Sequence, residues 1–426
     1  MFYAEASERL SSLCGTVSSY GTARTRALLD ELGSPDDALR IVHVAGTNGK
    51  GSVCAMLSAV LREAGHSTGV FTSPAVLSYA ERFTVDGAPA DARVFSSSLE
   101  KVICALPRVA ERGLGTPTLF EAETALALLV FKECGAEMCV LECGLGGTED
   151  ATNAVRRKQL AVVTSLGLDH TRELGSSISD IARAKAGIIS GRAVCAPAPA
   201  EAAAVLYPLC ARVAAQPSDI RLSEEGTTFV LDGEERFTRL IGVHQALNAS
   251  LAISAAELLS ESGIALPKSA VDRGLARAVH RARLEVLRAG NIAQTPYKVS
   301  LSAGKTLILD GAHNPHGARA LAESLRALYP GRRLAAVVGV LADKDAHGIA
   351  GALLPAPSRV VAVTPSSPRA RSAESTAEIF REEAEEAEIR CLVAAGEGVR
   401  RETERLLEEE DIVLVAGSLT LFRELA

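Results

Sequence analysis

Short runs of apolar residues recur along the chain and are separated by longer stretches expected to be helical. The runs are rich in β-branched residues and do not alternate with polar ones. This pattern is typical of parallel strands that are buried on both faces. The predicted strands are Leu39–Val44, Met138–Glu142, Leu160–Ser165, Ala193–Ala196, Thr306–Asp310, Arg333–Val338, Arg359–Val363 and Asp411–Val415.

The order of strands and helices predicts an α/β architecture throughout. Ser52–Ala64 is the helix expected after the first strand, and Thr118–Lys132 is a second, mostly apolar helix. A chain of 426 residues is long for one domain. The segment Gly290–Lys305 is polar and contains Gly, Pro and Ser, so we predict domains over 1–289 and 306–426 joined by a linker over 290–305.

Composition narrows the classes of function. A net charge of -7 does not favour non-specific binding to a nucleic acid backbone. No apolar run is long enough to span a bilayer, and the N-terminus lacks the pattern of a secretory signal. The nine cysteines are scattered, with Cys139 and Cys143 as the nearest pair, which favours buried thiols over a zinc site. We therefore expect a cytoplasmic protein that has no nucleic acid or membrane partner.

The segment Val44–Ser52, VAGTNGKGS, is similar to a phosphate-binding loop but departs from the strict form G-x-x-x-x-G-K-[ST]. Gly51 follows the lysine, and Val44 stands where the first glycine would fall. A predicted strand enters the segment and a predicted helix leaves it. Glycines let backbone N–H groups approach a phosphate, and the helix N-terminus adds partial positive charge. Lys50 would then meet the outer phosphates, whereas the alternative is an ordinary strand–turn–helix with a surface lysine.

The whole chain resembles the folylpolyglutamate synthase/dihydrofolate synthase family of the Mur-type amide ligases. The motifs that carry the resemblance follow in the family's order. They are GTNGKGS (46–52), TSP (72–74), ER (81–82), TLFE (118–121), LECGLGGTEDATN (141–153), TSLGLDHTRELG (164–175), IARAKAGI (181–188), HQALN (244–248), RLE (283–285), DGAHNPHG (310–317) and AGS (416–418).

The resemblance implies an N-terminal P-loop ATPase-like domain and a C-terminal Rossmann-like domain with the active site in the cleft between them. It implies that ATP phosphorylates the carboxylate of dihydropteroate or a reduced folate, and that L-glutamate then attacks the acyl phosphate. ATP and Mg²⁺ are the implied cofactors, with a monovalent cation as a further candidate, and the protein is expected to be a monomer.

The resemblance also implies a metal site made by Ser73, Glu142, His170 and Lys185, the last as a carbamate. A carboxylate that ends a buried strand, as Glu142 does, is costly unless it meets a cation. Taken singly, the alternatives are a helix-capping serine, an ion-paired glutamate, a hydrogen-bonded histidine and a helix-surface lysine.

Nucleotide and substrate contacts carry over in the same way. Lys50, Lys185 and His313 are the implied catalytic residues. The implied nucleotide contacts are Gly46, Thr47, Asn48, Gly49, Lys50, Gly51, Ser52, Asn248, Arg283 and Asp310. The implied substrate contacts are Pro74, Arg82, Thr118, Leu119, Phe120, Glu121, Glu149 and Ser418.

Several positions depart from the family pattern. They include Ala75 after TSP, Thr148 and Glu149 in the glycine motif, and Ala184 before Lys185. These changes concern the substrate side more than the ATP side. The sequence leaves open whether the chain makes dihydrofolate, extends polyglutamates or does both. A ligase for another acid and a non-catalytic nucleotide-binding protein are the alternatives.

Overall fold

The computed structural model describes residues 1–426 except 1–2, 17–20, 355, 385–387 and 393–396. The chain forms two compact units. The first comprises Met1–Asp219, Phe229–Arg239 and Ala246–Val279, and the second comprises Ile220–Thr228, Leu240–Gln245 and His280–Ala426. The boundaries predicted from the linker composition stay a prediction.

An eight-stranded sheet forms the centre of the first unit, in the order β4-β3-β2-β5-β1-β6-β7-β8. The six strands in the order β2-β5-β1-β6-β7-β8 are parallel to one another, and β3 and β4 extend the sheet beyond β2 in antiparallel fashion. Their bounds are β1 Arg40–Ala45, β2 Thr68–Phe71, β3 Phe83–Val85, β4 Ala88–Pro89, β5 Met138–Glu142, β6 Leu160–Val163, β7 Ala193–Cys195 and β8 Arg212–Val213.

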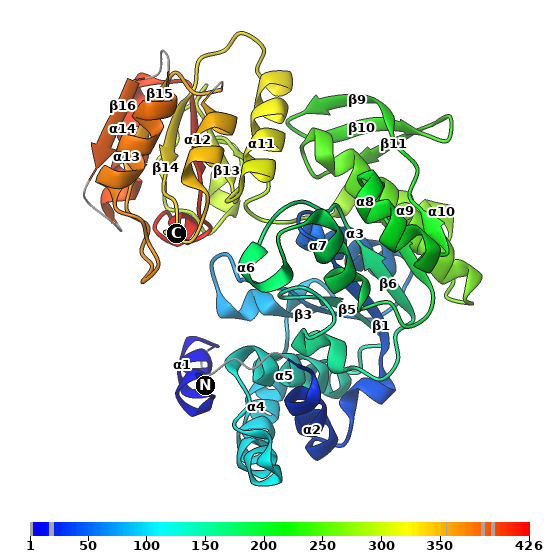
Figure 1. Cartoon of the computed structure of the whole chain (residues 1–426). Coiled ribbons are helices and arrows are strands. Elements are labelled where there is room, and N and C mark those ends of the chain that lie inside the picture. The colour runs from blue at the N-terminus through cyan, green and yellow to red at the C-terminus, as the bar shows by residue number, and fades with distance from the viewer. Residues whose placement is uncertain (1–2, 17–20, 355, 385–387, 393–396) are drawn as a thin grey trace. The chain divides into compact units, whose positions relative to one another are not determined.

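Helices cover both faces of this sheet, which explains why its central strands are apolar on both sides (Figure 1). One core joins Phe71, Phe83 and Leu141 of the strands to apolar side chains of α2, α4 and α5. A second core packs α7 and α8 against β6 and β7. The helices are α1 Tyr3–Leu13, α2 Ala23–Glu31, α3 Lys50–Glu63, α4 Ala92–Val109, α5 Leu119–Glu133, α6 Thr171–Leu174, α7 Ile178–Ala186, α8 Ala200–Leu206, α9 Val243–Glu261 and α10 Lys268–Arg277.

Helix α10 packs so closely on α3 that one residue has no room for a side chain. A β-carbon on Gly274 of α10 would lie 2.5 Å from the α-carbon and 2.6 Å from the amide nitrogen of Val60 of α3. Since these are backbone atoms, they cannot yield by changing a rotamer. The helix that follows the glycine-rich loop is therefore held by direct backbone contact.

The second unit has a six-stranded sheet in the order β12-β13-β17-β14-β15-β16. Only β12 is antiparallel to its neighbour. The helices α11, α12 and α13 pack their apolar faces against it, as Leu321, Ile349 and Phe380 illustrate. The bounds are β12 Glu285–Leu287, β13 Thr306–Asp310, β14 Ala335–Val338, β15 Arg359–Val363, β16 Glu388–Leu392, β17 Ile412–Ala416, α11 Pro315–Leu328, α12 Ala346–Leu353, α13 Ala373–Glu383, α14 Glu397–Glu409 and α15 Thr420–Arg423.

A further sheet of three strands, β9 Ser218–Ser223, β10 Gly226–Leu231 and β11 Glu234–Thr238, has the order β11-β10-β9. The α/β class with parallel sheets is confirmed, and all eight predicted strands are present within two residues of their expected ends. None of the helices in the described part of the chain combines the length and the apolar character that crossing a bilayer requires.

Candidate functional site

Polar residues gather at the carboxyl ends of the central strands of the first unit. Strand β1 pairs with β5 and with β6, so that Val44 lies opposite Glu142 and Ala45 lies opposite Val163. The glycine-rich loop therefore leaves β1 beside the end of β5 and the start of the segment after β6. In open α/β sheets this edge is where ligands bind.

Hydrogen bonds fix the loop 46–49 to the segment that follows β6. The backbone N–H groups of Thr47 and Asn48 both donate to the carbonyl of Ser165, at 2.9 and 3.3 Å. The Thr164 hydroxyl donates to the carbonyl of Asn48 at 2.7 Å, and the Thr47 hydroxyl donates to the carbonyl of Gly167 at 3.0 Å. The loop is thus held before any ligand arrives. The N–H groups of the first turn of α3 have no acceptor within the helix and are the donors that can meet a phosphate.

Gly49 caps the start of α3 in a conformation that only glycine adopts easily. Its φ is 86°, in the left-handed region. A β-carbon there would also lie 2.4 Å from Oδ1 of Asn248, which is buried on α9. The expected nucleotide residue Asn248 therefore lies directly against the loop, whereas Ser52 is buried in the first turn of α3.

Two lysines meet at one carbonyl oxygen of the loop. The amine of Lys50 donates to the carbonyl of Gly46 at 3.1 Å and to that of Thr47 at 3.3 Å. The amine of Lys185, on α7, donates to the same Gly46 carbonyl at 2.8 Å. Lys185 is buried, and this burial, followed by the charge of Lys50, lowers the pKa of its amine to about 8. The pair concentrates positive charge at one end of the glycine-rich loop.

Glu142 ends β5 with a buried carboxylate, as the sequence suggested. Its Oε2 accepts the backbone N–H of Ser73 at 3.0 Å, so two of the four expected metal ligands lie together. Burial and, next, the Glu142 carboxylate raise the pKa of the thiol of Cys54, a residue of α3, well above its ordinary value.

His170 is placed at the start of α6 with a left-handed φ of 50°. Its side chain is 43% exposed, and Nε2 lies 3.9 Å from the Asp169 carboxylate. In the part of the chain that the structure describes, no three His, Cys, Asp or Glu side chains gather closely enough to hold a metal ion. The expected ligands also include a serine hydroxyl and a lysine carbamate, which are not among these four residue types. The metal site therefore stays a prediction.

The donors that are present suit a hard cation. Mg²⁺ prefers oxygen ligands, usually one or two carboxylates together with water and phosphate oxygens. Glu142 offers a buried carboxylate, and Ser73, whose backbone N–H that carboxylate accepts, carries a hydroxyl oxygen. These residues fit Mg²⁺ better than they fit a softer metal that requires sulfur or several imidazole ligands.

Asp150, Thr152 and His43 form a buried series of hydrogen bonds beside the loop after β5. The sequence analysis did not assign this series a role. Asp150 accepts the backbone N–H of Leu145 at 2.7 Å and the hydroxyl of Thr152. Because the Thr152 hydroxyl donates to Asp150, it accepts from Nε2 of His43 at 2.7 Å. Burial raises the pKa of Asp150 and lowers the pKa of His43 well below its ordinary value. In the sequence, a histidine within the otherwise apolar strand LRIVHV was the feature that could have indicated these hydrogen bonds.

Arg82 lies in a pocket of aromatic rings. Its guanidinium carbon is 5.2 Å from the ring centre of Phe71, 5.8 Å from that of Phe120 and 5.9 Å from that of Tyr79. Its charge is met by Glu123, a nearly fully buried carboxylate whose pKa is raised by burial. Glu123 was missed by the sequence analysis, although a second acid in the apolar helix 119–133 was a sign of it.

Phe120 also reaches the glycine motif after β5. A β-carbon on Gly144 would lie 2.6 Å from the end of the Phe120 ring, so the ring packs on bare backbone there. The structure thereby brings together Arg82, Phe120 and the 144–150 loop. These are three of the segments that the resemblance assigned to substrate.

Other expected substrate residues have clear structural roles. Thr118 and Glu121 form a reciprocal cap at the start of α5, and Leu119 packs on the core of the first unit. The Glu121 carboxylate also binds Arg24 through two hydrogen bonds of 2.9 and 2.8 Å. Pro74 and Glu149 are exposed.

The second unit carries its own cluster at the carboxyl end of β13. Asp310 is buried, and its two oxygens accept the N–H groups of Leu284 and Ala312, each at 2.8 Å. Burial raises the pKa of Asp310, and Arg283 opposes that shift. Nδ1 of His313 lies 2.8 Å from the Gly311 carbonyl, which can only accept, so Nδ1 carries the proton.

Ser418 joins this cluster through the sheet register. Strand β17 pairs with β13 so that Ala416 lies opposite Asp310, and Ser418 follows two residues later. Its buried hydroxyl is 2.8 Å from that of Thr420. The structure therefore brings Arg283, Asp310, His313 and Ser418 to one edge of the second sheet.

Comparison with known proteins adds to this geometry. Residues 44–256 match the Mur ligase middle domain, and residues 298–419 match the Mur ligase glutamate ligase domain. The dihydrofolate synthase/folylpolyglutamate synthase of Bacillus subtilis is 36% identical over 76% of each chain. That of Mycobacterium tuberculosis is 34% identical over 83% of this chain and 76% of its own.

Solved structures agree along the full length. The Mycobacterium tuberculosis folylpolyglutamate synthase complexed with ADP and AMPPCP superposes with a TM-score of 0.84, at 29% identity, covering 99% of this chain and 98% of its own. Escherichia coli FolC in complex with DHPP and ADP gives a TM-score of 0.82 at 28% identity, with 99% and 96% covered.

Proposed function

The chain belongs to the Mur ligase family, in its folylpolyglutamate synthase/dihydrofolate synthase branch, and we propose that it joins L-glutamate to the carboxylate of a pteroate or folate at the expense of ATP. Relatives of the branch bind ADP and, in one case, DHPP. The single observation of this structure that carries the proposal is the convergence of Lys50 and Lys185 on the Gly46 carbonyl of the glycine-rich loop.

The reaction brings together an anionic carboxylate and an anionic triphosphate, so its first demand is positive charge at a fixed place. The loop is anchored by the segment 164–167, and the amines of Lys50 and Lys185 both donate to its Gly46 carbonyl. The first-turn N–H groups of α3 would bind the phosphates, and Lys50 would turn from the loop carbonyls to the transferring phosphoryl group. Asn248, packed on Gly49, would contact the nucleotide beyond the loop.

We propose that Ser73, Glu142, His170 and Lys185 as a carbamate hold Mg²⁺ at this edge. The ion would neutralise phosphate charge and polarise the phosphoryl group when bound. Glu142 and Ser73 already lie together, and Lys185 is within reach of the loop. A lysine whose pKa is about 8 has on the order of a tenth of its amine neutral at pH 7, and the neutral amine is the form that takes up CO₂.

The pteridine part of the substrate would lie beside Arg82 and Phe120, next to the 144–150 loop. Support comes from the rings around Arg82 and from the close approach of Phe120 to Gly144. Pro74, Glu149 and the start of α5 at 118–121 would border this region. Because Glu121 is engaged by Thr118 and Arg24, it would act there by holding the helix start in place.

Residues of the second unit would serve the incoming amino acid and the nucleotide. Asp310 and Arg283 would contact the nucleotide, and Ser418 the substrate. His313, protonated on Nδ1, would present Nε2 to the glutamate or to a phosphate. We further propose that the protein works as a monomer in the cytoplasm, which light scattering and fractionation of cells would test.

A coupled assay of phosphate release tests the function. Purified protein should hydrolyse ATP only when L-glutamate and a pterin acid are both present. Dihydropteroate and a reduced folate monoglutamate are the two acids to compare, and a cell-wall precursor acid is the control. Mass spectrometry should show a product heavier by one glutamyl residue. Turnover without any acid, or with the cell-wall precursor alone, would contradict the proposal.

A further inference from the structure

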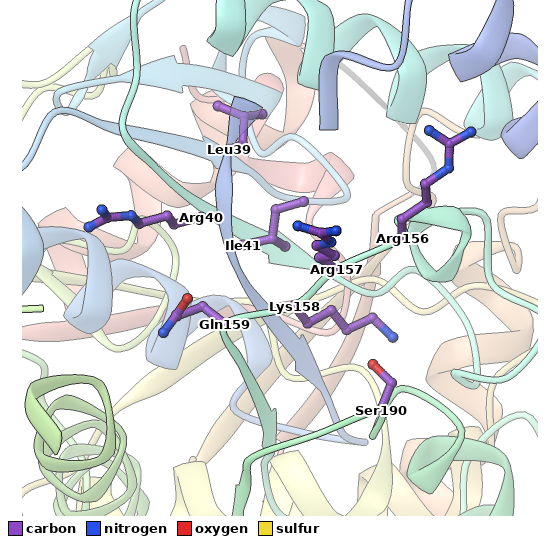
Figure 2. Close-up of a pocket in the computed structure, with 8 residues that line it drawn as sticks. All are labelled: Leu39, Arg40, Ile41, Arg156, Arg157, Lys158, Gln159 and Ser190. Atoms are coloured by element: carbon purple, nitrogen blue, oxygen red, sulfur yellow. The ribbon is translucent and has the colours of Figure 1, made fainter. Parts of the chain in front are cut away.

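A basic pocket lies at the edge of the first sheet that is opposite to the glycine-rich loop. It has a volume of about 430 Å³ and opens where β1 and β6 begin. Figure 2 shows the side chains that line it. Its polar lining consists of Arg40, Arg156, Arg157, Lys158, Gln159 and Ser190, and Leu39 and Ile41 add an apolar part.

Two of its four cations have no carboxylate to neutralise them. Arg40 is paired with Glu137 at 3.1 Å, and Arg156 is paired with Asp30 at 2.7 Å and Asp37 at 3.0 Å. By contrast, no ion pair involves Arg157 or Lys158 anywhere in the described residues. Positive charge in a concave site without a counter-ion attracts anions, because low-dielectric walls focus the field.

Lys158 is held in place by neutral acceptors. Its amine donates to the carbonyl of Ile188 at 2.7 Å and to Oδ1 of Asn153. In Figure 2 the side chain extends from the start of β6 toward Ser190. Burial lowers the pKa of Lys158 to about 8, which reflects a charge that is partly removed from water without a negative partner. An anion in the pocket would supply that partner.

Arg157 supplies a different kind of donor. Its side chain is exposed and lies on the same side of β1 as Lys158 in Figure 2. A guanidinium binds phosphate and carboxylate groups through two parallel hydrogen bonds, whereas an ammonium acts as a point charge. The pair Arg157 and Lys158 thus matches a ligand that has more than one anionic oxygen group.

We propose that this pocket is a second anion-binding site, which takes a small molecule with two or more phosphate or carboxylate groups. It is separate from the nucleotide loop, because the pocket adjoins Arg40, the first residue of β1, and the loop follows Ala45, the last. A pocket of this volume is of the size that small ligands occupy. The inference does not depend on the reaction proposed above.

Isothermal titration of the full chain tests it, with tripolyphosphate and citrate as separate probes. Saturating ADP and Mg²⁺ are included so that the glycine-rich loop is occupied, and about 0.15 M salt limits non-specific attraction. At least one probe should bind with one-to-one stoichiometry. Tripolyphosphate alone would assign a phosphate-bearing ligand, citrate alone a polycarboxylate, and both would assign the shared oxyanion chemistry.

Substitutions test whether the measured heat of probe binding arises at this pocket. Arg157→Gln should weaken binding on the order of tenfold, which is about 1.4 kcal/mol. Arg93→Gln, at an exposed arginine at the start of α4, should leave it unchanged. Arg157→Glu should abolish binding, and since Arg157 is exposed and unpaired, both variants should fold. The proposal is overturned if neither probe saturates, if raising the ADP concentration displaces the probe, or if Arg157→Gln and Arg93→Gln bind alike.

Discussion

Lys50 begins α3 and Lys185 lies near the end of α7, yet their amines donate to one acceptor, the carbonyl oxygen of Gly46, at 3.1 and 2.8 Å. Two ammonium groups so close together repel each other. A bound phosphate, or the loss of the positive charge of one amine, would reduce this repulsion. The predictions about the nucleotide loop follow from this pair.

Lys50→Ala should abolish ligation while the protein stays folded. The variant removes a positive charge from the phosphoryl group in transit, and loss of one such group lowers turnover on the order of a hundredfold or more. The measurement is the coupled assay together with circular dichroism. Lys132→Ala, at an exposed lysine in the last turn of α5, serves as the matched control. Near-normal turnover of folded Lys50→Ala would remove the nucleotide-loop assignment.

Lys185→Ala should also lose activity, and an added carboxylic acid should reverse part of this loss. If the lysine works as a carbamate, a short carboxylic acid such as acetate should restore part of the lost turnover, because it supplies the missing anionic oxygens. Arg183→Ala, at a largely exposed arginine on the same helix, should retain its activity, and acetate should not change its turnover. Full activity of the wild type in CO₂-depleted buffer, with an unmodified Lys185 in its intact mass, would rule the carbamate out.

Glu142→Gln keeps the shape of the side chain and removes its charge. We expect the magnesium concentration for half-maximal activity to rise on the order of tenfold, since one charged oxygen ligand is lost. A magnesium titration of turnover measures this. Glu378→Gln, at an exposed position of α13, should leave the titration curve where it is. Identical curves for Glu142→Gln and the wild type would count against the metal site.

Phe120→Ala should weaken binding of the pteridine substrate without affecting ATP. The ring packs on Gly144 and lies beside Arg82, so its removal takes away one face of the expected pocket. We expect KM for the pteridine acid to rise about tenfold, as the loss of about 1.4 kcal/mol implies. The KM for ATP is the internal control, and equal changes in both constants would indicate general damage to the fold.

His43 should make the first unit sensitive to acid. Its pKa lies well below the ordinary value of 6.5 because it is fully buried, so the native state stays neutral while the unfolded state takes up a proton. The unfolded state then binds more protons below about pH 6.5, and the free energy of unfolding falls as pH falls, by at most about 1.4 kcal/mol per pH unit.

Chemical denaturation at several pH values between about 5 and 7 measures this slope. In His43→Gln, which retains a donor for Thr152 but cannot titrate, the slope should be shallower than in the wild type. His347→Gln, at an exposed histidine of α12, should retain the wild-type slope. Equal slopes for His43→Gln and the wild type would show that His43 does not carry the effect.

The fold could be predicted from the sequence because its strands are continuous apolar runs. β1, β5 and β6 contain few polar residues, and burial on both faces of a parallel sheet requires such a pattern. The glycine-rich loop could be predicted equally well, since a strand, a run of turn-forming residues and a helix follow one another in the sequence. The position of Glu142 at a strand end followed from the same reasoning.

Contacts between distant segments were not accessible in this way. Nothing local to Arg82 or Glu123 shows that the two side chains pair, because they are 41 residues apart and meet only through packing of the sheet on α5. The hydrogen bonds from His43 through Thr152 to Asp150 depend likewise on the contact between strand β1 and the helical turn Ala151–Ala154, which are far apart in the sequence. The engagement of Glu121 by Arg24 spans 97 residues, and the motif alone gave no sign of it.

The close packing of Gly274 on Val60 limits how this protein can vary. A side chain at position 274 would have to push α10 away from α3, and α3 carries the glycine-rich loop at its start. Substitution there should therefore be tolerated poorly although the residue binds nothing. Among natural relatives that retain this helix pair, we expect glycine at the equivalent position, and a saturation library scored by growth should reject most alternatives at 274 as strictly as at Lys50.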